Sequence, residues 1–125
     1  MLLQDFYSVD TINTISDSKY VASITLNKNH AIFKGHFPGN PVTPGVCMMQ
    51  IIKEITENIL NVSLTMVSTS NVKFMALINP EVNAKLTLEL EISENEASEI
   101  KVKNTTSFDE TVALKLSNTY KKIAS

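Results

Sequence analysis

The sequence has no arginine and no tryptophan, a single cysteine, and only three glycines among its 125 residues. Its 11 basic residues are therefore all lysines, and 13 acidic residues outnumber them, so that the net charge is −2. This balance argues against a nucleic-acid-binding protein, which typically carries a basic surface. The lone Cys47 rules out an internal disulfide and a cysteine-rich zinc site.

Long hydrophobic runs are also missing, and the runs present fall far short of the roughly 20 residues that cross a membrane. Residues 1–10 have no basic start and no extended apolar core, so they do not resemble a signal peptide. A length of 125 residues with 43% apolar side chains suits one globular domain, residues 1–125, with its own core. We expect a soluble, cytoplasmic protein that does not bind a membrane.

The few glycines and prolines are concentrated in one place. All three glycines and three of the four prolines lie within Gly35–Gly45, which predicts a structured turn. A helix is predicted directly after it, over Gly45–Leu60, with Thr43 as N-cap and Pro44 at the first helical position. Apolar residues at steps of three and four predict the buried face of this helix: Met48, Ile51, Ile52, Ile55 and Ile59.

Alternating apolar and polar residues predict strands on both sides of this helix. The predicted strands are Tyr7–Ile15, Lys19–Leu26, Val67–Ile78, Ala84–Ile92, Ile100–Ser107 and Thr111–Lys121. Two strands, one helix and four strands make an α+β fold, in which a curved antiparallel sheet wraps around one long central helix.

The turn segment also carries the residues with the clearest chemical potential. His36 stands between Gly35 and Phe37, and a loop histidine with little charge nearby can act as a base near pH 7. The first N–H groups of the following helix, at Gly45 and Val46, can stabilise a developing oxyanion. A base beside an oxyanion site is the minimum equipment for removing a proton next to a carbonyl group.

Residues 35–46 read G-H-F-P-G-N-P-V-T-P-G-V, a string that closely resembles the bacterial 3-hydroxyacyl-[acyl-carrier-protein] dehydratases of the hotdog fold. The predicted order of elements is similar to that fold over essentially the full chain. The resemblance implies that His36 is the catalytic base and that the backbone N–H groups of Gly45 and Val46 hold the acyl thioester.

The resemblance also implies the surroundings of the site. An acyl chain would lie in a tunnel beside the helix, lined by Phe33, Phe37 and Met49. The thioester would arrive on acyl carrier protein, with no metal and no organic cofactor. The sites would form between two subunits, in a homodimer, a larger assembly of dimers, or a heterodimer with another hotdog subunit.

One position departs from the family pattern. The family's second catalytic residue is an acid on the helix, fourteen positions after the histidine, and this chain has Gln50 there. A glutamine can donate a hydrogen bond but cannot give up a proton at neutral pH. The acid stands one helical turn later, at Glu54, where the family commonly has glutamine. Glu54 reaching the site through a water or a shifted substrate is one hypothesis.

Several functions remain open on this sequence. The first is dehydration of 3-hydroxyacyl thioesters on acyl carrier protein, in fatty-acid or related acyl-chain biosynthesis, with His36, Gln50 and Glu54 as catalytic residues. The second is a catalytically impaired subunit that binds acyl carrier protein or pairs with an active hotdog partner that supplies the acid. An acyl thioesterase is less favoured, because thioesterase relatives usually depend on a helix carboxylate that Gln50 does not supply.

Overall fold

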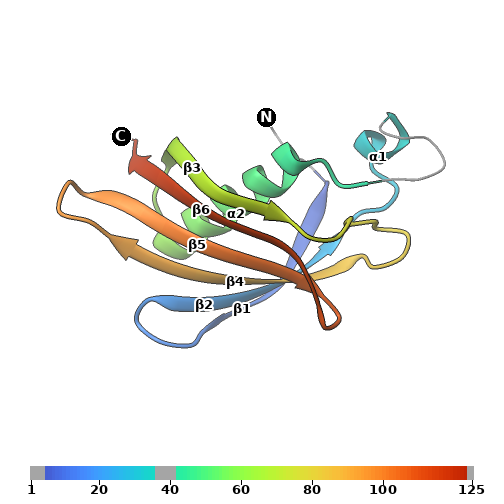
Figure 1. The fold of residues 1–125 in the computed structure, drawn as a ribbon, viewed down its shortest axis with the longest axis horizontal. Helices are drawn as coiled ribbons and strands as arrows, with labels where there is room; N and C mark the ends of the chain where they lie inside the picture. Colours follow the sequence, from blue (N-terminus) through green and yellow to red (C-terminus); the bar gives the residue numbers. More distant parts are fainter. Residues whose placement is uncertain (1–4, 36–41, 124–125) are drawn as a thin grey trace.

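A computed structural model describes residues 5–35 and 42–123 of the chain. Its elements are, in order, β1 (Tyr7–Thr14), β2 (Lys19–Leu26), α1 (Ala31–Gly35), α2 (Gly45–Leu60), β3 (Leu64–Phe74), β4 (Lys85–Glu94), β5 (Glu99–Phe108) and β6 (Thr111–Lys122). The strands form one antiparallel sheet in the order β1-β2-β4-β5-β6-β3. The sheet curves, and α2 lies against its concave face (Figure 1).

The α2 helix has the predicted bounds, and four of its five predicted core residues are buried. Its buried side chains are Cys47, Met48, Ile51, Ile52, Ile55 and Thr56, whereas Ile59 is only partly buried at the edge of the core. The apolar side of β4 packs on the same core, because Leu86, Leu88, Leu90 and Ile92 are all buried. Each such side chain contributes roughly 1.5–3 kcal/mol by leaving water.

The start of α2 differs from the prediction by one residue. Pro44, not Thr43, is the N-cap, with an extended backbone at φ −61° and ψ 145° and no side-chain hydrogen bond to the helix. Proline already has the φ of a helix, so the chain enters the helix by a change of ψ at this residue alone. The helix therefore begins at Gly45 without a side chain that caps its first N–H groups.

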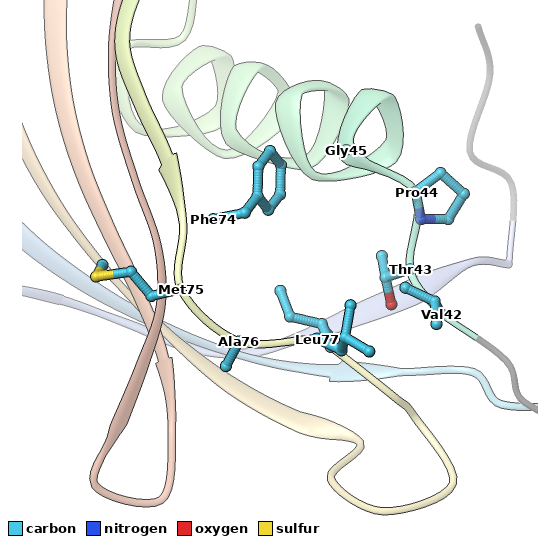
Figure 2. Close-up of a pocket in the computed structure, with 9 residues that line it drawn as sticks. Val42, Thr43, Pro44, Gly45, Phe74, Met75, Ala76 and Leu77 are labelled. Carbon is cyan, nitrogen blue, oxygen red and sulfur yellow. The ribbon is translucent and has the colours of Figure 1, made fainter.

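The bounds of β1, β4, β5 and β6 lie within two residues of the prediction, and two other elements differ by more. The five-residue helix α1 was not predicted. The strand β3 lies three to four residues earlier than the predicted Val67–Ile78, because Leu64 is fully buried and its N–H donates to the Glu57 carboxylate at 2.8 Å. After Phe74, residues 75–78 leave the sheet and face the start of α2 (Figure 2).

Candidate active site

A hollow of about 460 Å³ lies beside the first turn of α2. One wall is the chain that leads into the helix, Val42–Gly45, and the other is the end of β3 with the segment after it, Phe74–Ile78 (Figure 2). A hydrogen bond from the Thr43 N–H to the Ile78 carbonyl, at 2.8 Å, ties the two walls together. The lining is mainly apolar, so the hollow suits an apolar ligand.

Free backbone N–H groups stand at the edge of this hollow. The N–H groups of Cys47 and Met48 both donate to the Pro44 carbonyl, at 3.0 and 3.2 Å. For the N–H groups of Gly45 and Val46, no acceptor is found in residues 5–35 and 42–123. Together with the positive end of the helix dipole, these two donors can stabilise a negatively charged oxygen. Gly45 itself lines the hollow, while the Val46 side chain is 62% exposed.

The predicted residues Gln50 and Glu54 lie in a different place. Neither lines the hollow; they belong to a hydrogen-bonded group with Tyr7 of β1. The Tyr7 hydroxyl donates to Glu54 Oε1 at 2.8 Å, and the Gln50 amide, through Nε2, donates to Glu54 Oε2 at 2.9 Å. Because β1 and β3 are the two opposite edges of the sheet, a single subunit does not bring this group into the hollow.

Tyr7 is the residue of this group that the sequence did not single out. Burial raises the pKa of its phenol, and the hydrogen bond to Glu54 and the charges of Glu54 and Glu57 raise it further. Tyr7 therefore stays neutral and remains a hydrogen-bond donor to Glu54 at neutral pH. Tyr7 is the first residue of a half-exposed strand, and the sequence alone does not indicate that it contacts Glu54.

Of the remaining predicted residues, two lie in or against the core and two lie outside the described part of the chain. His36 and Phe37 lie outside the described residues. Phe33 is buried in the core and stacks on Phe6, with ring centroids 4.9 Å apart. Met49 is partly buried against the core. Neither Phe33 nor Met49 lines the hollow of a single subunit.

Two other side chains behave as ordinary structural residues. Cys47 is buried on α2, and burial raises the pKa of its thiol, which agrees with a role as a small apolar side chain. The backbone N–H of Ile32 donates to Nδ1 of His30 at 3.1 Å, and the His30 ring meets the Phe6 ring edge-on. Within the described segments, no three His, Cys, Asp or Glu side chains gather as a metal site would require.

A family model named ApeI-like, described as ApeI dehydratase, matches residues 12–115. The match covers most of the chain and includes α1, α2, the four strands β2, β3, β4 and β5 in full, and parts of β1 and β6. The chain belongs to this family of dehydratases. This confirms the predicted relation to the 3-hydroxyacyl-[acyl-carrier-protein] dehydratases at the level of the family.

Curated proteins similar to this chain are also named dehydratases. The 3-hydroxyacyl-[acyl-carrier-protein] dehydratase FabZ of Zymomonas mobilis is 30% identical over 113 residues, which cover 84% of this chain and 72% of that protein. The enzyme of the same name from Lactococcus lactis is 39% identical over 46 residues. That shorter match covers 37% of this ApeI-like chain and only 30% of the Lactococcus protein.

Solved structures confirm the predicted hotdog fold. One is the dehydratase heterocomplex ApeI:P from Xenorhabdus doucetiae, with a TM-score of 0.67, 18% identity, and coverage of 94% of this chain and 97% of that chain. Another is a hypothetical thioesterase with coenzyme A from Streptococcus pneumoniae, with a TM-score of 0.68, 13% identity, and coverage of 98% and 91%. At these identities the similarity shows the fold alone. Within the described residues, no helix is long and apolar enough to span a membrane.

Proposed function

We propose that this chain dehydrates 3-hydroxyacyl thioesters carried on acyl carrier protein, in fatty-acid or related acyl-chain biosynthesis in the cytoplasm. The observation that carries the proposal is the pair of free N–H groups at Gly45 and Val46 beside an apolar hollow. Gly45 and Val46 end the family string of residues 35–46, which begins with G-H-F-P, and the chain belongs to a dehydratase family.

The reaction begins at the carbon between the thioester carbonyl and the hydroxyl-bearing carbon. His36 removes a proton from this C2 carbon, and the electron pair moves onto the thioester oxygen, where the N–H groups of Gly45 and Val46 stabilise it. The pair then returns to form the C2=C3 double bond, while the C3–O bond breaks. The departing hydroxide takes up one proton and leaves as water, so that atoms and charge balance.

The source of the proton for the departing hydroxyl differs from the one that the family resemblance implies. Gln50 can donate a hydrogen bond to the hydroxyl but not a proton, and Glu54 already accepts hydrogen bonds on both carboxylate oxygens. The proton can return from protonated His36, or come from a carboxyl group of a second subunit. The second source favours the alternative function, a subunit that is impaired alone and works beside an active hotdog partner.

A partner subunit fits the β3 edge of the sheet. Among the described residues no strand pairs with its outer side, and several apolar side chains on β3 and just after it are exposed: Val67, Val72, Phe74, Met75 and Leu77. The β1 edge carries Asp10 in an ion pair with Lys85 instead. An apolar edge strand invites pairing with another chain, so we propose a homodimer or a heterodimer formed through β3, with acyl carrier protein as the visiting partner.

Intact-protein mass spectrometry of a 3-hydroxyacyl carrier protein tests the proposal. Loss of one water from the loaded carrier supports a dehydratase. Release of the acyl group as a free acid, leaving the unloaded carrier, would instead show a thioesterase. If the chain alone is silent, but its mixture with a hotdog protein that carries the helix acid turns over faster than that protein alone, the impaired-subunit alternative is correct. No change to the carrier in either mixture would overturn both functions.

A further inference from the structure

In the group formed by Tyr7, Glu54 and Gln50, both hydrogen bonds are donated to the Glu54 carboxylate. Tyr7 has only a hydroxyl to offer and donates it to Glu54 Oε1 at 2.8 Å. Gln50 turns its amide nitrogen, not its amide oxygen, toward Glu54 Oε2 at 2.9 Å. A carboxylate accepts hydrogen bonds and repels other acceptors, so Glu54 selects one of the two orientations that a glutamine amide could otherwise adopt.

The same contact determines what Gln50 offers to a ligand. With one N–H directed at Glu54, the amide keeps its oxygen Oε1 and its second N–H for another partner. Both groups then point away from Glu54, from a half-buried side chain on the helix that begins at the hollow. A hydrogen bond to a charged acceptor is stronger than one between neutral groups, so this orientation is held firmly.

The hydrogen bond from Tyr7 holds the Glu54 carboxylate in place. It reaches Glu54 from β1, 47 residues away in the chain, so the helix side chain is anchored to the opposite edge of the sheet from the hollow. Glu57 and Lys53 are the other charged side chains on this part of α2. Glu57 is committed to the Leu64 N–H at 2.8 Å, and no ion pair of Lys53 occurs among the residues described.

We propose that Glu54 is a positioning residue: anchored by Tyr7, it holds the Gln50 amide so that Oε1 and the second N–H meet the 3-hydroxyl group of a substrate that the other subunit of a dimer holds in its hollow, and it exchanges no proton during the reaction. This inference rests on the proposed dehydratase function for the identity of the substrate. The arrangement is the reverse of the acid-then-glutamine order implied by the family resemblance. In that order the acid would be at position 50 and its amide support at position 54.

The orientation of Gln50 can be measured without any enzyme assay. The chain has only two glutamines, Gln4 and Gln50, so ¹⁵N labelling of glutamine side chains gives two NH₂ groups in a proton–nitrogen NMR spectrum. We expect two well-separated proton signals for Gln50, one of them shifted by the carboxylate. In Glu54→Ala the separation should collapse toward that of Gln4, and in Tyr7→Phe it should shrink. Glu57→Ala, the removal of another carboxylate on α2, should leave it unaltered.

Unchanged Gln50 signals in Glu54→Ala would overturn the proposal, whatever the activity of the protein. Conversely, a parent protein without turnover would count against the proposed function and leave the NMR result to decide the positioning. The two failures are therefore distinguishable.

Kinetics separate a positioning residue from an acid. If Glu54 only positions Gln50, Glu54→Gln should lower kcat about tenfold and keep the shape of the pH profile. If Glu54 is the acid, the loss should be about 10²–10⁴-fold, with one limb of the profile removed. A loss of that size in Glu54→Gln, with one limb of the pH profile removed, would contradict the proposal.

Discussion

The ring of Phe74 lies against the backbone of Gly45, with its Cζ atom 3.0 Å from the position that a β-carbon on Gly45 would occupy. Gly45 is the first residue of α2, and Phe74 is the last residue of β3. The contact brings the free N–H groups at the start of the helix directly beside the apolar wall of the hollow (Figure 2). The absence of a side chain at position 45 therefore keeps the proposed thioester site open.

Gly45→Ala should reduce activity far more than stability. The Phe74 ring is 54% exposed and can turn away from the added methyl group, while alanine favours the helix over glycine by up to about 1 kcal/mol. We expect a melting temperature close to that of the parent and at least a tenfold loss of kcat/KM, because the displaced ring narrows the hollow. Unchanged turnover in a folded Gly45→Ala protein would place the thioester elsewhere.

The β3 edge should control assembly. Val72→Lys places a charge on the exposed apolar part of this edge, and burial of an unpaired charge in an interface is costly. We expect the molar mass from light scattering to fall from that of a dimer to that of a monomer at micromolar concentration. Ile15→Lys, a similar change in the β1–β2 turn, is the matched control and should remain dimeric. A dimeric mass for Val72→Lys, equal to that of the parent, would exclude β3 as the interface.

Alkaline pH should destabilise the fold through its buried tyrosines. Burial raises the pKa of Tyr120 from 10.0 to about 12, the charge of Glu57 adding to the effect and the Asn118 hydrogen bond opposing it; the pKa of Tyr7 is raised as well. The folded state then holds phenol protons that the unfolded chain releases above about pH 10, so the free energy of unfolding falls as pH rises from about 10. Urea titrations across this range test the decline, which should be shallower in Tyr7→Phe. Equal slopes in the two proteins would contradict the raised pKa of Tyr7.

Gln50→Glu alone should not simply restore the family's acid. It would place two carboxylates in contact where an amide and a carboxylate are now 2.9 Å apart, and like charges raise the pKa of one member of such a pair. Relative to the parent, the variant should lose stability as pH rises from the ordinary glutamate pKa of about 4.3 through that raised value. We expect a deficit of about 1 kcal/mol at pH 7 in urea unfolding. Adding Glu54→Gln should remove it, and a single variant as stable as the parent at neutral pH would argue against the contact.

Local sequence signals were sufficient for the elements whose cause is local. The bounds of α2 follow from the apolar period of three and four between Gly45 and Leu60, and β4 follows from the alternation of its leucines with polar residues. The hotdog fold was accessible because residues 35–46 match a dense family string. The N-cap was misplaced because Thr43 and Pro44 are both favoured near a helix start, and ψ at Pro44 decides between them.

Contacts between distant parts of the chain were beyond such signals. Tyr7 and Glu54 are 47 residues apart, and neither strand alternation nor helix period indicates which strand residue faces which helix residue. The early start of β3 has a shorter-range cause that the strand alternation also does not indicate, because the N–H of the buried Leu64 donates to the Glu57 carboxylate on the preceding helix. The hollow itself needs two segments about 30 residues apart, Val42–Gly45 and Phe74–Ile78, which only the folded sheet brings together.

Deuterium uptake at C2 of a carrier-bound 3-hydroxyacyl thioester in heavy water tests the central claim most directly, since it reports the proton removal assigned to His36. The account predicts deuterium uptake with the parent protein, even if water loss is slow because position 50 has glutamine in place of an acid. It predicts no uptake with His36→Ala. The same uptake in His36→Ala, or water loss from the parent through a path that does not depend on His36, would contradict it.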